Sequence, residues 1–454
     1  MPQVFPFRAV QYVPLGPAGD VSPLIAPPYD VLDVPAKAAL LAKNSKNVVG
    51  IDLPHIPAKD LGPPSAYTQA ASSFRDWLAS GTMHRLDKPA MFVYRETFEF
   101  RGSTHQRTGM ACTIEVQPFG PRPGGGVLPH EETFSGPKED RFALMKASRA
   151  QFSPIFGLHQ DAQGAACSLL KRIMASRAPD ITAQTNEGFG GPLKHELWTV
   201  QDDATINAYA DALKGEDIFV ADGHHRYNTA LNYLKHLESQ GPVPADHPAR
   251  RCMYVLVSMS DPGMVIGPTH RVLAGMSGYS FDAFRAAAGG SLNITEFSGE
   301  LRGIENAMEQ AAQRSKGNAL GLYDFATRRC YVATLAAPDP LKERFPGKVR
   351  AWRELDVALV QYLIVESICQ PKLNGGQPVK WAFPHSIQEV IDIGDGTERG
   401  SGGGKAFSPQ LAVIVRPTPL EAVREISRAN ELMPQKSTFF FPKLATGLFI
   451  NLLE

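Results

Sequence analysis

The chain has 454 residues, of which 43% are hydrophobic and 20% are charged, a composition that supports buried cores and excludes wholesale disorder. Its length predicts two or three domains, or one large elaborated domain. Lysine plus arginine and aspartate plus glutamate both number 46, so the formal net charge is zero. This balance argues against a protein whose main task is to neutralise a nucleic-acid backbone.

The five cysteines are widely spaced and form no Cys-x-x-Cys pair. Their pattern argues against a disulfide framework and a thiolate zinc site, and it is typical of a reducing compartment. The first residues lack the charged and apolar regions of a secretory signal. No stretch approaches the ~18 consecutive apolar residues of a membrane helix. We therefore expect a soluble, cytoplasmic protein without membrane partners.

Proline and glycine are spread along the chain, which predicts many short elements joined by turns. In the first part of the chain, hydrophobic periodicity predicts helices at 35–43, 66–80 and 139–150, a strand-like run at 48–53, and paired strands at 91–100 and 109–117. Further along, it predicts strands at 191–200, 217–221 and 251–259 and helices at 203–214 and 222–239. The glycine-rich segment 394–405 predicts a mobile surface loop.

The most informative segment runs from 217 to 227. Here an apolar strand leads into Asp222, Gly223, His224, His225 and Arg226, and a helix follows at once. The start of such a helix directs unpaired backbone N–H groups and a positive dipole end at one point. Two imidazoles and a guanidinium at this point make a candidate phosphate site. Asp222 would cap the helix or hold Mg²⁺ against the phosphate.

Two other interpretations of this segment stay open. In the first, Asp222 is a simple helix cap followed by exposed histidines without a role. In the second, His224 and His225 coordinate a catalytic metal. The metal interpretation is the weaker one, because consecutive helical residues point ~100° apart and no His-x-x-x-His spacing occurs here.

A second polar cluster contains His130, Glu131 and Glu132, just after a glycine- and proline-rich stretch. Its carboxylates can supply a general base and a metal ligand. Alternatively, they lie at the start of a helix, where acidic side chains are favoured by the helix dipole.

A third cluster lies near the C-terminus, where Lys436, Ser437 and Thr438 offer one cation and two hydroxyl groups to an anion. Three phenylalanines at 439–441 predict a buried strand, and Lys443 follows as a second cation. The alternative is that the phenylalanines are core residues and both lysines are only solvated.

Six motifs occur in one family in the order found here: APPYDV (26–31), PHEET (129–133), FSPIF (152–156), ADGHHRY (221–227), PTHR (268–271) and MPQKST (433–438). On these motifs the chain resembles the bacterial and archaeal domain-of-unknown-function 1015 family over nearly its whole length. Asn228 stands where the family would have glutamate, which argues against a catalytic role at that position. Segment 394–405 looks like an insertion.

The strand followed by Asp-Gly-His-x-Arg also resembles the phosphate loop of the ParB/sulfiredoxin-like superfamily. Its sequence is most similar to the Asp-Gly-His-Thr-Arg motif of free serine kinases. In those kinases the motif binds nucleotide phosphates while a separate glutamate activates the serine hydroxyl. Members of the family also resemble proteins encoded beside phosphoglycerate dehydrogenase. By analogy, this resemblance implies serine or phosphoserine metabolism.

We therefore expect an α+β protein with a heavily elaborated ParB/sulfiredoxin-like mixed core. It would be one domain over 1–454, subdivided into a core with the phosphate loop at 1–260 and an α+β part at 261–454. The predicted function is phosphoryl transfer on a small hydroxylated metabolite, serine or phosphoserine above all, by a kinase- or phosphatase-type enzyme. Mg²⁺ and ATP or ADP are the expected cofactors. The alternative is a nucleotide-binding regulatory or scaffold protein of ParB-like type without turnover.

This hypothesis assigns a role to each candidate residue, because phosphoryl transfer depends mainly on positioning and charge stabilisation. The catalytic residues would be Glu131, as acid or base, His224 and His225. Phosphate would be bound by Gly223, Arg226, Lys436, Ser437, Thr438 and Lys443. Asp222 would hold the metal. The partner would be a phosphorylated small molecule or a nucleotide rather than a nucleic acid.

Overall fold

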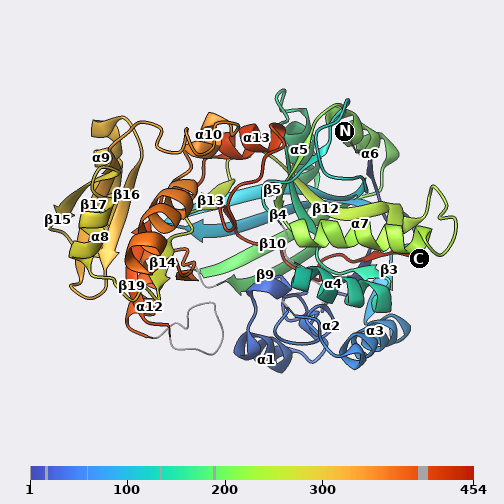
Figure 1. The fold of residues 1–454 in the computed structure, drawn as a ribbon. Coiled ribbons are helices and arrows are strands. Elements are labelled where there is room, and N and C mark those ends of the chain that lie inside the picture. Colours follow the sequence, from blue (N-terminus) through green and yellow to red (C-terminus); the bar gives the residue numbers. More distant parts are fainter. Residues whose placement is uncertain (1, 16–18, 59, 133–134, 188–190, 397–406) are drawn as a thin grey trace. The chain divides into compact units, whose positions relative to one another are not determined.

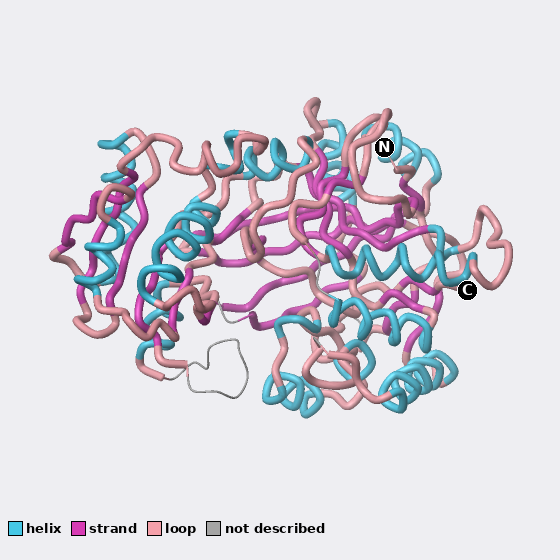
Figure 2. Tube along the Cα trace, viewed as in Figure 1, coloured by secondary structure: helices cyan, strands magenta, loops and turns pink. Residues whose placement is uncertain are grey.

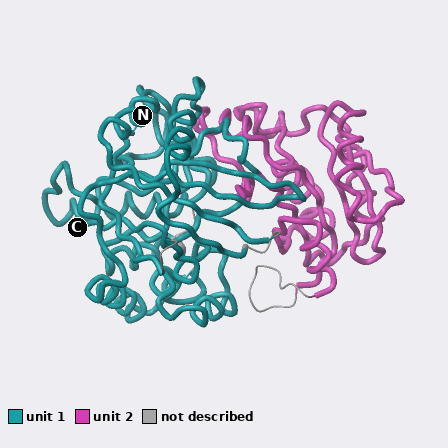
Figure 3. The backbone as a smooth tube through the Cα atoms, turned by 180° about the vertical axis from the view of Figure 1, so that it is seen from behind, with its two compact units in different colours: residues 1–265, 442–454 teal, residues 266–441 magenta. Residues whose placement is uncertain are grey.

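The computed structural model describes residues 2–15, 19–58, 60–132, 135–187, 191–396 and 407–454. The chain forms two compact units, coloured separately in Figure 3: unit 1 spans Met1–Val265 and Pro442–Glu454, and unit 2 spans Ile266–Phe441. Both units contain helices and strands (Figures 1 and 2), which confirms the predicted α+β class. No helix in the described ranges combines the length and apolar character needed to cross a bilayer. The predicted mobile loop lies outside the described residues from 397 onward.

Unit 1 is built on a nine-stranded mixed sheet with the strand order β6-β11-β8-β12-β5-β4-β10-β9, and β1 pairs with β5. Its strands are β1 (Val4–Phe5), β4 (Met91–Phe100), β5 (Ser103–Glu115), β6 (Val127–Leu128), β8 (Ile155–His159), β9 (Ile181–Glu187), β10 (Gly191–Val200), β11 (Ile218–Asp222) and β12 (Arg251–Ser258). Two short antiparallel pairs join β2 (Val10–Tyr12) to β3 (Met83–Arg85) and β7 (Ala150–Gln151) to β21 (Asn451–Leu452).

The helices of unit 1 are α1 (Val34–Lys43), α2 (Val49–Asp52), α3 (Pro64–Ala79), α4 (Ser135–Ser148), α5 (Ala165–Ser176), α6 (Asp203–Ala212) and α7 (His224–Glu238), with short 3₁₀ turns η1 (Tyr29–Val31) and η2 (Pro248–Arg250). Residues of α5, α6 and α7 share one core cluster with Met91 and Val93 of β4. Because side chains alternate along a strand, the residue between them, Phe92, faces the other side of the sheet. There its ring stacks on that of Phe449, with ring centroids 5.7 Å apart. The C-terminal residues of unit 1 therefore pack on the sheet face opposite these three helices.

The strand and helix predicted around the 217–227 motif are confirmed as β11 and α7. The strand-like run predicted at 48–53 is wrong, because it forms the helical turn α2. The reason is the fully buried Asn47. Its side-chain oxygen accepts the N–H of Val49 at 2.9 Å, while its amide donates to two carbonyls of the preceding loop. A short apolar run does not distinguish a strand from a buried helical turn, and these hydrogen bonds of Asn47 favour the turn.

Unit 2 contains a six-stranded antiparallel sheet with the order β15-β17-β16-β19-β14-β18. Its strands are β14 (Arg271–Ala274), β15 (Leu292–Phe297), β16 (Ala319–Asp324), β17 (Arg329–Leu335), β18 (Lys380–Ala382) and β19 (Pro409–Ile414), and a separate pair is formed by β13 (Val265–Gly267) and β20 (Phe439–Phe441). Its helices are α8 (Phe281–Ala288), η3 (Leu301–Gly303), α9 (Ile304–Ser315), α10 (Arg350–Arg353), α11 (Asp356–Ala358), the π-helix η4 (Leu359–Leu373), α12 (Ile387–Gly394) and α13 (Leu420–Arg428). The buried β20 confirms the strand predicted at 439–441.

Candidate functional site

Strand β11 delivers the ADGHHRY motif to the start of α7. It pairs with β8, and the register shifts between Val220 and Asp222, an irregularity of the kind that re-aims side chains beside functional sites. Gly223 follows with φ of 98°, a left-handed value that glycine adopts without steric cost. A Cβ atom on Gly223 would lie 3.1 Å from Cζ of Arg226. Glycine therefore allows both the sharp turn and the close packing of the guanidinium against it.

Asp222 is the ionic centre of this loop. Its Oδ1 accepts a hydrogen bond from Nζ of Lys443 at 2.5 Å, and its Oδ2 pairs with the guanidinium of Arg226. Burial alone would raise the pKa of the Asp222 carboxyl, but Lys443 and Arg226 hold it well below its usual range. The N-cap of α7 is Gly223, and no side chain among the described residues caps the helix. The interpretation of Asp222 as the helix cap is therefore wrong.

The arrangement around Asp222 does not fit a metal ion. Both carboxylate oxygens already face side-chain cations, which would repel Mg²⁺. Throughout the part of the chain that the structure describes, no three His, Cys, Asp or Glu side chains group together to hold a metal. The assignment of Mg²⁺ to Asp222, and of a metal to His224 and His225, finds no support in this geometry.

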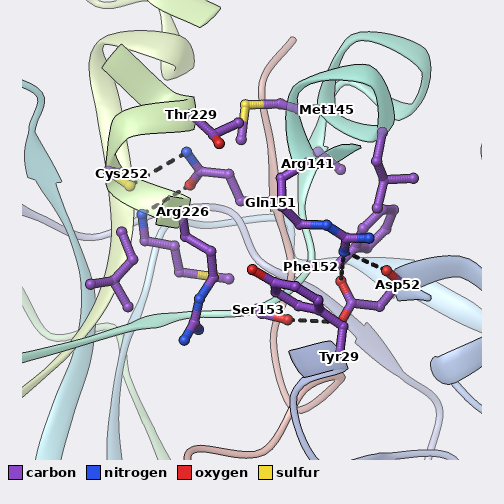
Figure 4. A pocket seen from close by; sticks show the side chains of 14 residues that line it. Tyr29, Asp52, Arg141, Met145, Gln151, Phe152, Ser153, Arg226, Thr229 and Cys252 are labelled. Atoms are coloured by element: carbon purple, nitrogen blue, oxygen red, sulfur yellow. Dashed lines mark hydrogen bonds and ion pairs between the residues drawn. The ribbon is translucent and has the colours of Figure 1, made fainter. Parts of the chain in front are cut away.

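Arg226 lies on the first turn of α7 and is 9% exposed. It donates to the carbonyl of Pro154 and to Asp222, whereas its Nε has no acceptor within the described residues. Burial would lower the pKa of Arg226, yet nearby carboxylates, Asp222 first, raise it, so the guanidinium stays charged. Figure 4 shows Arg226 and Arg141 extending from two helices toward Tyr29 around a cavity of about 40 Å³. A cavity of this size has room for a few waters and is too small for a nucleotide.

His224 and His130 connect the loop to the second predicted cluster. The backbone N–H of His130 donates to Nε2 of His224 at 3.2 Å, and the two rings meet edge to face with centroids 4.7 Å apart. Burial lowers the pKa of both imidazoles, so both are neutral at pH 7. Glu131 lies beside them, with Oε1 at 3.9 Å from Nε2 of His130. His225 is half-buried on the first turn of α7.

Seven of the ten predicted site residues therefore come together in unit 1: Glu131, Asp222, Gly223, His224, His225, Arg226 and Lys443. The other three, at 436–438, belong to unit 2. Lys436 is exposed and Ser437 is buried. The carbonyl of Ser437 accepts from Thr418 at 2.6 Å, and the carbonyl of Lys436 accepts from Arg271 at 2.8 Å. These bonds form a firmly held turn, and the phosphate-binding role of its side chains stays a prediction.

A second buried ionic group next to the loop was missed by the sequence analysis. Arg141 pairs with Asp140 at 2.6 Å and with Asp52 at 3.4 Å, and its guanidinium lies 4.0 Å from the ring centroid of Tyr29. Ser153 donates to the carboxylate of Asp52 at 3.0 Å. Tyr29 and Ser153 lie in the motifs 26–31 and 152–156, which were the available signal. Those motifs identified the residues, but only the fold shows that they adjoin Arg226 in one cavity.

Asp30 is a further carboxylate that the predicted set omitted. It follows the buried Tyr29 in η1 and is exposed. It makes no hydrogen bond or ion pair with another described residue. Burial lowers the pKa values of Lys443 and Arg226, whereas the negative charges of Asp222 and Asp30 raise them. Asp30 therefore acts electrostatically on the same two cations as Asp222.

The chain matches a family described as "Protein of unknown function (DUF1015)" over residues 4–358. Five of the six motifs lie within this range, and MPQKST at 433–438 lies beyond it. No match was found among curated proteins.

The chain is also similar to solved structures of other proteins. A free serine kinase in complex with AMP has 12% identity and a TM-score of 0.35, covering 74% of this chain and 88% of that chain. A conserved hypothetical protein from Pyrococcus furiosus has 12% identity and a TM-score of 0.32, with coverages of 73% and 90%. SbnI with a C-terminal truncation, from Staphylococcus aureus, has 9% identity and a TM-score of 0.32, with coverages of 75% and 87%.

Proposed function

We propose a function for this chain, which belongs to the DUF1015 family of proteins of unknown function, from the residues of its own site. The start of α7 in unit 1 binds the phosphate of a nucleotide or small phosphoester and supports phosphoryl transfer involving a small hydroxylated metabolite. One observation carries this proposal. Lys443 and Arg226, which are far apart in the chain, meet at Asp222 beside the start of α7, which no side chain in the described ranges caps.

The charges at this point favour an anion. Two permanent cations face one carboxylate, and the first turn of α7 adds backbone N–H groups and the positive end of the helix dipole. A phosphate can therefore share Lys443 with Asp222 and accept from the first-turn amides. Because Nε2 of His224 accepts the His130 amide, its ring proton lies on Nδ1, which is a donor at neutral pH.

Two carboxylates, those of Glu131 and Asp30, are candidates for the general base. Glu131 is held beside the His130–His224 pair, and we propose it as the group that takes the proton of the substrate hydroxyl. Asp30 is exposed and close enough to the cations to shift their pKa values. Glu131→Gln should lower turnover by ~10²–10⁴-fold while phosphate binding persists. Asp30→Asn tests the rival, and exposed Glu132→Gln is the matched control. If only Asp30→Asn lowers turnover, Glu131 is the wrong choice.

Serine or phosphoserine is the substrate that we propose first. It rests on the likeness of the 221–227 motif to that of free serine kinases. The experiment that tests the function measures binding of inorganic phosphate, AMP, ADP, ATP and phosphoserine by calorimetry, with and without Mg²⁺. Incubation of ATP with serine, followed by mass spectrometry for phosphoserine, then tests transfer. Binding with turnover supports the proposal, and tight nucleotide binding without turnover assigns a regulatory protein instead. A folded protein that binds none of these ligands overturns it.

A further inference from the structure

The sheet of unit 1 carries a fully buried ion pair outside the candidate site. Glu96 of β4 and Arg107 of β5 are cross-strand partners and are 2% and 1% exposed. Nε and Nη2 of Arg107 donate to Oε2 of Glu96 at 2.9 and 2.5 Å. A buried ion pair is often no more stabilising than apolar residues of similar volume, because both charges lose their hydration. Stability alone is therefore a weak explanation for this pair.

The other contacts of Arg107 lead to the phosphate loop. Its Nη2 also donates to the carbonyl of Pro442 at 2.6 Å, and its guanidinium lies 4.5 Å from the ring centroid of Phe156. Pro442 directly precedes Lys443. Phe156 is the partner of Asp222 in the ladder between β8 and β11. Arg107 thus contacts the chain next to both members of the Lys443–Asp222 pair.

Tyr94 makes a second contact with the C-terminal segment. Its hydroxyl donates to Oε1 of Glu96 at 3.1 Å, and its ring meets that of Phe449 edge to face with centroids 6.2 Å apart. Pro442 and Phe449 are therefore both contacted from the group around one buried carboxylate, through Arg107 and Tyr94. Lys443 lies between these two contacts, which restrain the backbone that carries its long side chain. Fixing the backbone reduces the conformational entropy that is lost when Nζ stays on Asp222.

We propose that Glu96, Arg107 and Tyr94 are positioning residues that hold segment 442–449 so that Lys443 reaches Asp222 and the bound phosphate. The proposal rests on the proposed function, because Lys443 contributes to chemistry only if the loop binds phosphate. None of the three needs to touch the ligand. Their effect on phosphate binding passes through Lys443.

Arg107→Lys is the decisive variant. A lysine keeps the charge opposite Glu96 but lacks the planar fork that also reaches Pro442. We expect binding of inorganic phosphate and of ADP, measured by calorimetry, to weaken at least about tenfold, as for the loss of a charged hydrogen bond. The control is Arg95→Lys, in the neighbouring Arg95–Glu196 pair of the same sheet, which should change affinity less than about twofold. Tyr94→Phe, which leaves no charge unpaired, replaces Arg107→Lys if that variant fails to fold.

A double variant separates positioning from a merely structural role. Because Arg107 acts through Lys443, adding Arg107→Lys to Lys443→Met should cause no further loss of affinity. If the affinity of the double variant instead falls by the product of the two separate effects, the proposal is overturned. Hydrogen exchange of peptides covering 442–446 gives a readout that does not depend on ligand. Exchange should accelerate in Arg107→Lys and not in Arg95→Lys, and unchanged exchange would overturn the positioning role. If the wild-type protein binds neither phosphate nor ADP, the proposed function fails while this exchange test still decides the anchoring of the segment.

Discussion

Two arginines lie at the centres of motif clusters, one in each unit, and they use their hydrogen bonds differently. In unit 1, Arg226 donates to one backbone carbonyl, that of Pro154, and pairs with the carboxylate of Asp222, while its Nε has no acceptor within the described residues. In unit 2, the guanidinium of Arg271 lies 5.0 Å from the ring centroid of Phe383. Arg271 donates to three backbone carbonyls, those of Thr269, Gln435 and Lys436.

This difference distinguishes a candidate binding site from a structural contact. An arginine that binds only backbone carbonyls closes a turn, and its bonds are satisfied by the chain itself. An arginine beside a carboxylate, a second cation and a helix start holds charge that an anionic ligand can share. Both arginines belong to motifs by which the chain resembles its family. A shared motif therefore does not by itself distinguish chemistry from structure.

Of the variants that test this comparison, Arg226→Ala should have the largest effect on stability and on phosphate binding. It removes one partner of a buried ion pair, which should lower the free energy of unfolding of unit 1 by about 3–5 kcal/mol and abolish phosphate binding. Arg271→Ala removes charged hydrogen bonds to carbonyls and should destabilise unit 2 by roughly 1.5–3 kcal/mol, with phosphate affinity retained. Hydrogen exchange read separately on peptides of each unit measures stability, and calorimetry measures binding. Equal loss of phosphate binding in both variants would contradict the distinction.

The local parts of this comparison could be predicted from sequence. The strand and helix around Asp222 were predicted because β-branched and aromatic residues precede a glycine and an apolar stripe follows it. The run at 439–441 was predicted because three phenylalanines are too apolar for a solvated loop. The turn at α2 was not predicted, because it is favoured by hydrogen bonds of Asn47 to Val49 and to the preceding loop, which no periodicity reveals.

The pairings between distant residues could not be predicted. Lys443 is 221 positions from Asp222, and only the sheet and the C-terminal segment together bring them into contact. Glu96 lies within the strand predicted at 91–100 and Arg107 lies before the one predicted at 109–117, and neither position predicts that both side chains are buried. Asp30 lies in the motif 26–31, but its electrostatic effect depends on the cations near it. Such contacts are properties of the tertiary fold and leave no periodic signal in the sequence.

Gly223→Ala should be the next most damaging change. The residue needs φ of 98°, and the new Cβ would lie 3.1 Å from Cζ of Arg226. Backbone strain of this kind costs about 1–3 kcal/mol, and displacement of the guanidinium should weaken phosphate binding as well. The matched control is Gly215→Ala, where φ is 87° but no atom lies within 4 Å of the added Cβ. Both variants should lose stability in urea unfolding, and only Gly223→Ala should lose affinity. Equal affinity in the two would show that the contact with Arg226 is unimportant.

Acid should weaken unit 1 through its buried histidines. Burial lowers the pKa values of His130 and His224, and it lowers that of His195 to about 3. As the pH falls below about 6.5, the unfolded chain binds these protons first, so stability is lost at up to ~1.4 kcal/mol per pH unit for each histidine. His224→Asn keeps an acceptor for the His130 amide and should reduce this slope by ~1.4 kcal/mol per pH unit. Urea unfolding near pH 7, 6 and 5 measures the slope, with exposed His84→Asn as control. An identical slope in wild type and His224→Asn would show that His224 is protonated in the folded state.

The smallest effect on stability is expected at Lys436, which tests whether the turn in unit 2 carries any phosphate chemistry. Lys436 is exposed, with φ of 57°, so Lys436→Ala should change the free energy of unfolding by no more than about 0.5 kcal/mol. The sequence predicts that its cation binds phosphate, and on that prediction the variant weakens phosphate binding while thermal stability hardly changes. Lys436→Gly removes the same charge and suits the left-handed backbone better. A loss of affinity caused by charge must therefore be equal in the two variants, whatever their stabilities. If both bind phosphate as tightly as the wild type while Lys443→Met does not, the prediction for Lys436 is wrong, and the turn that Arg271 holds is structural.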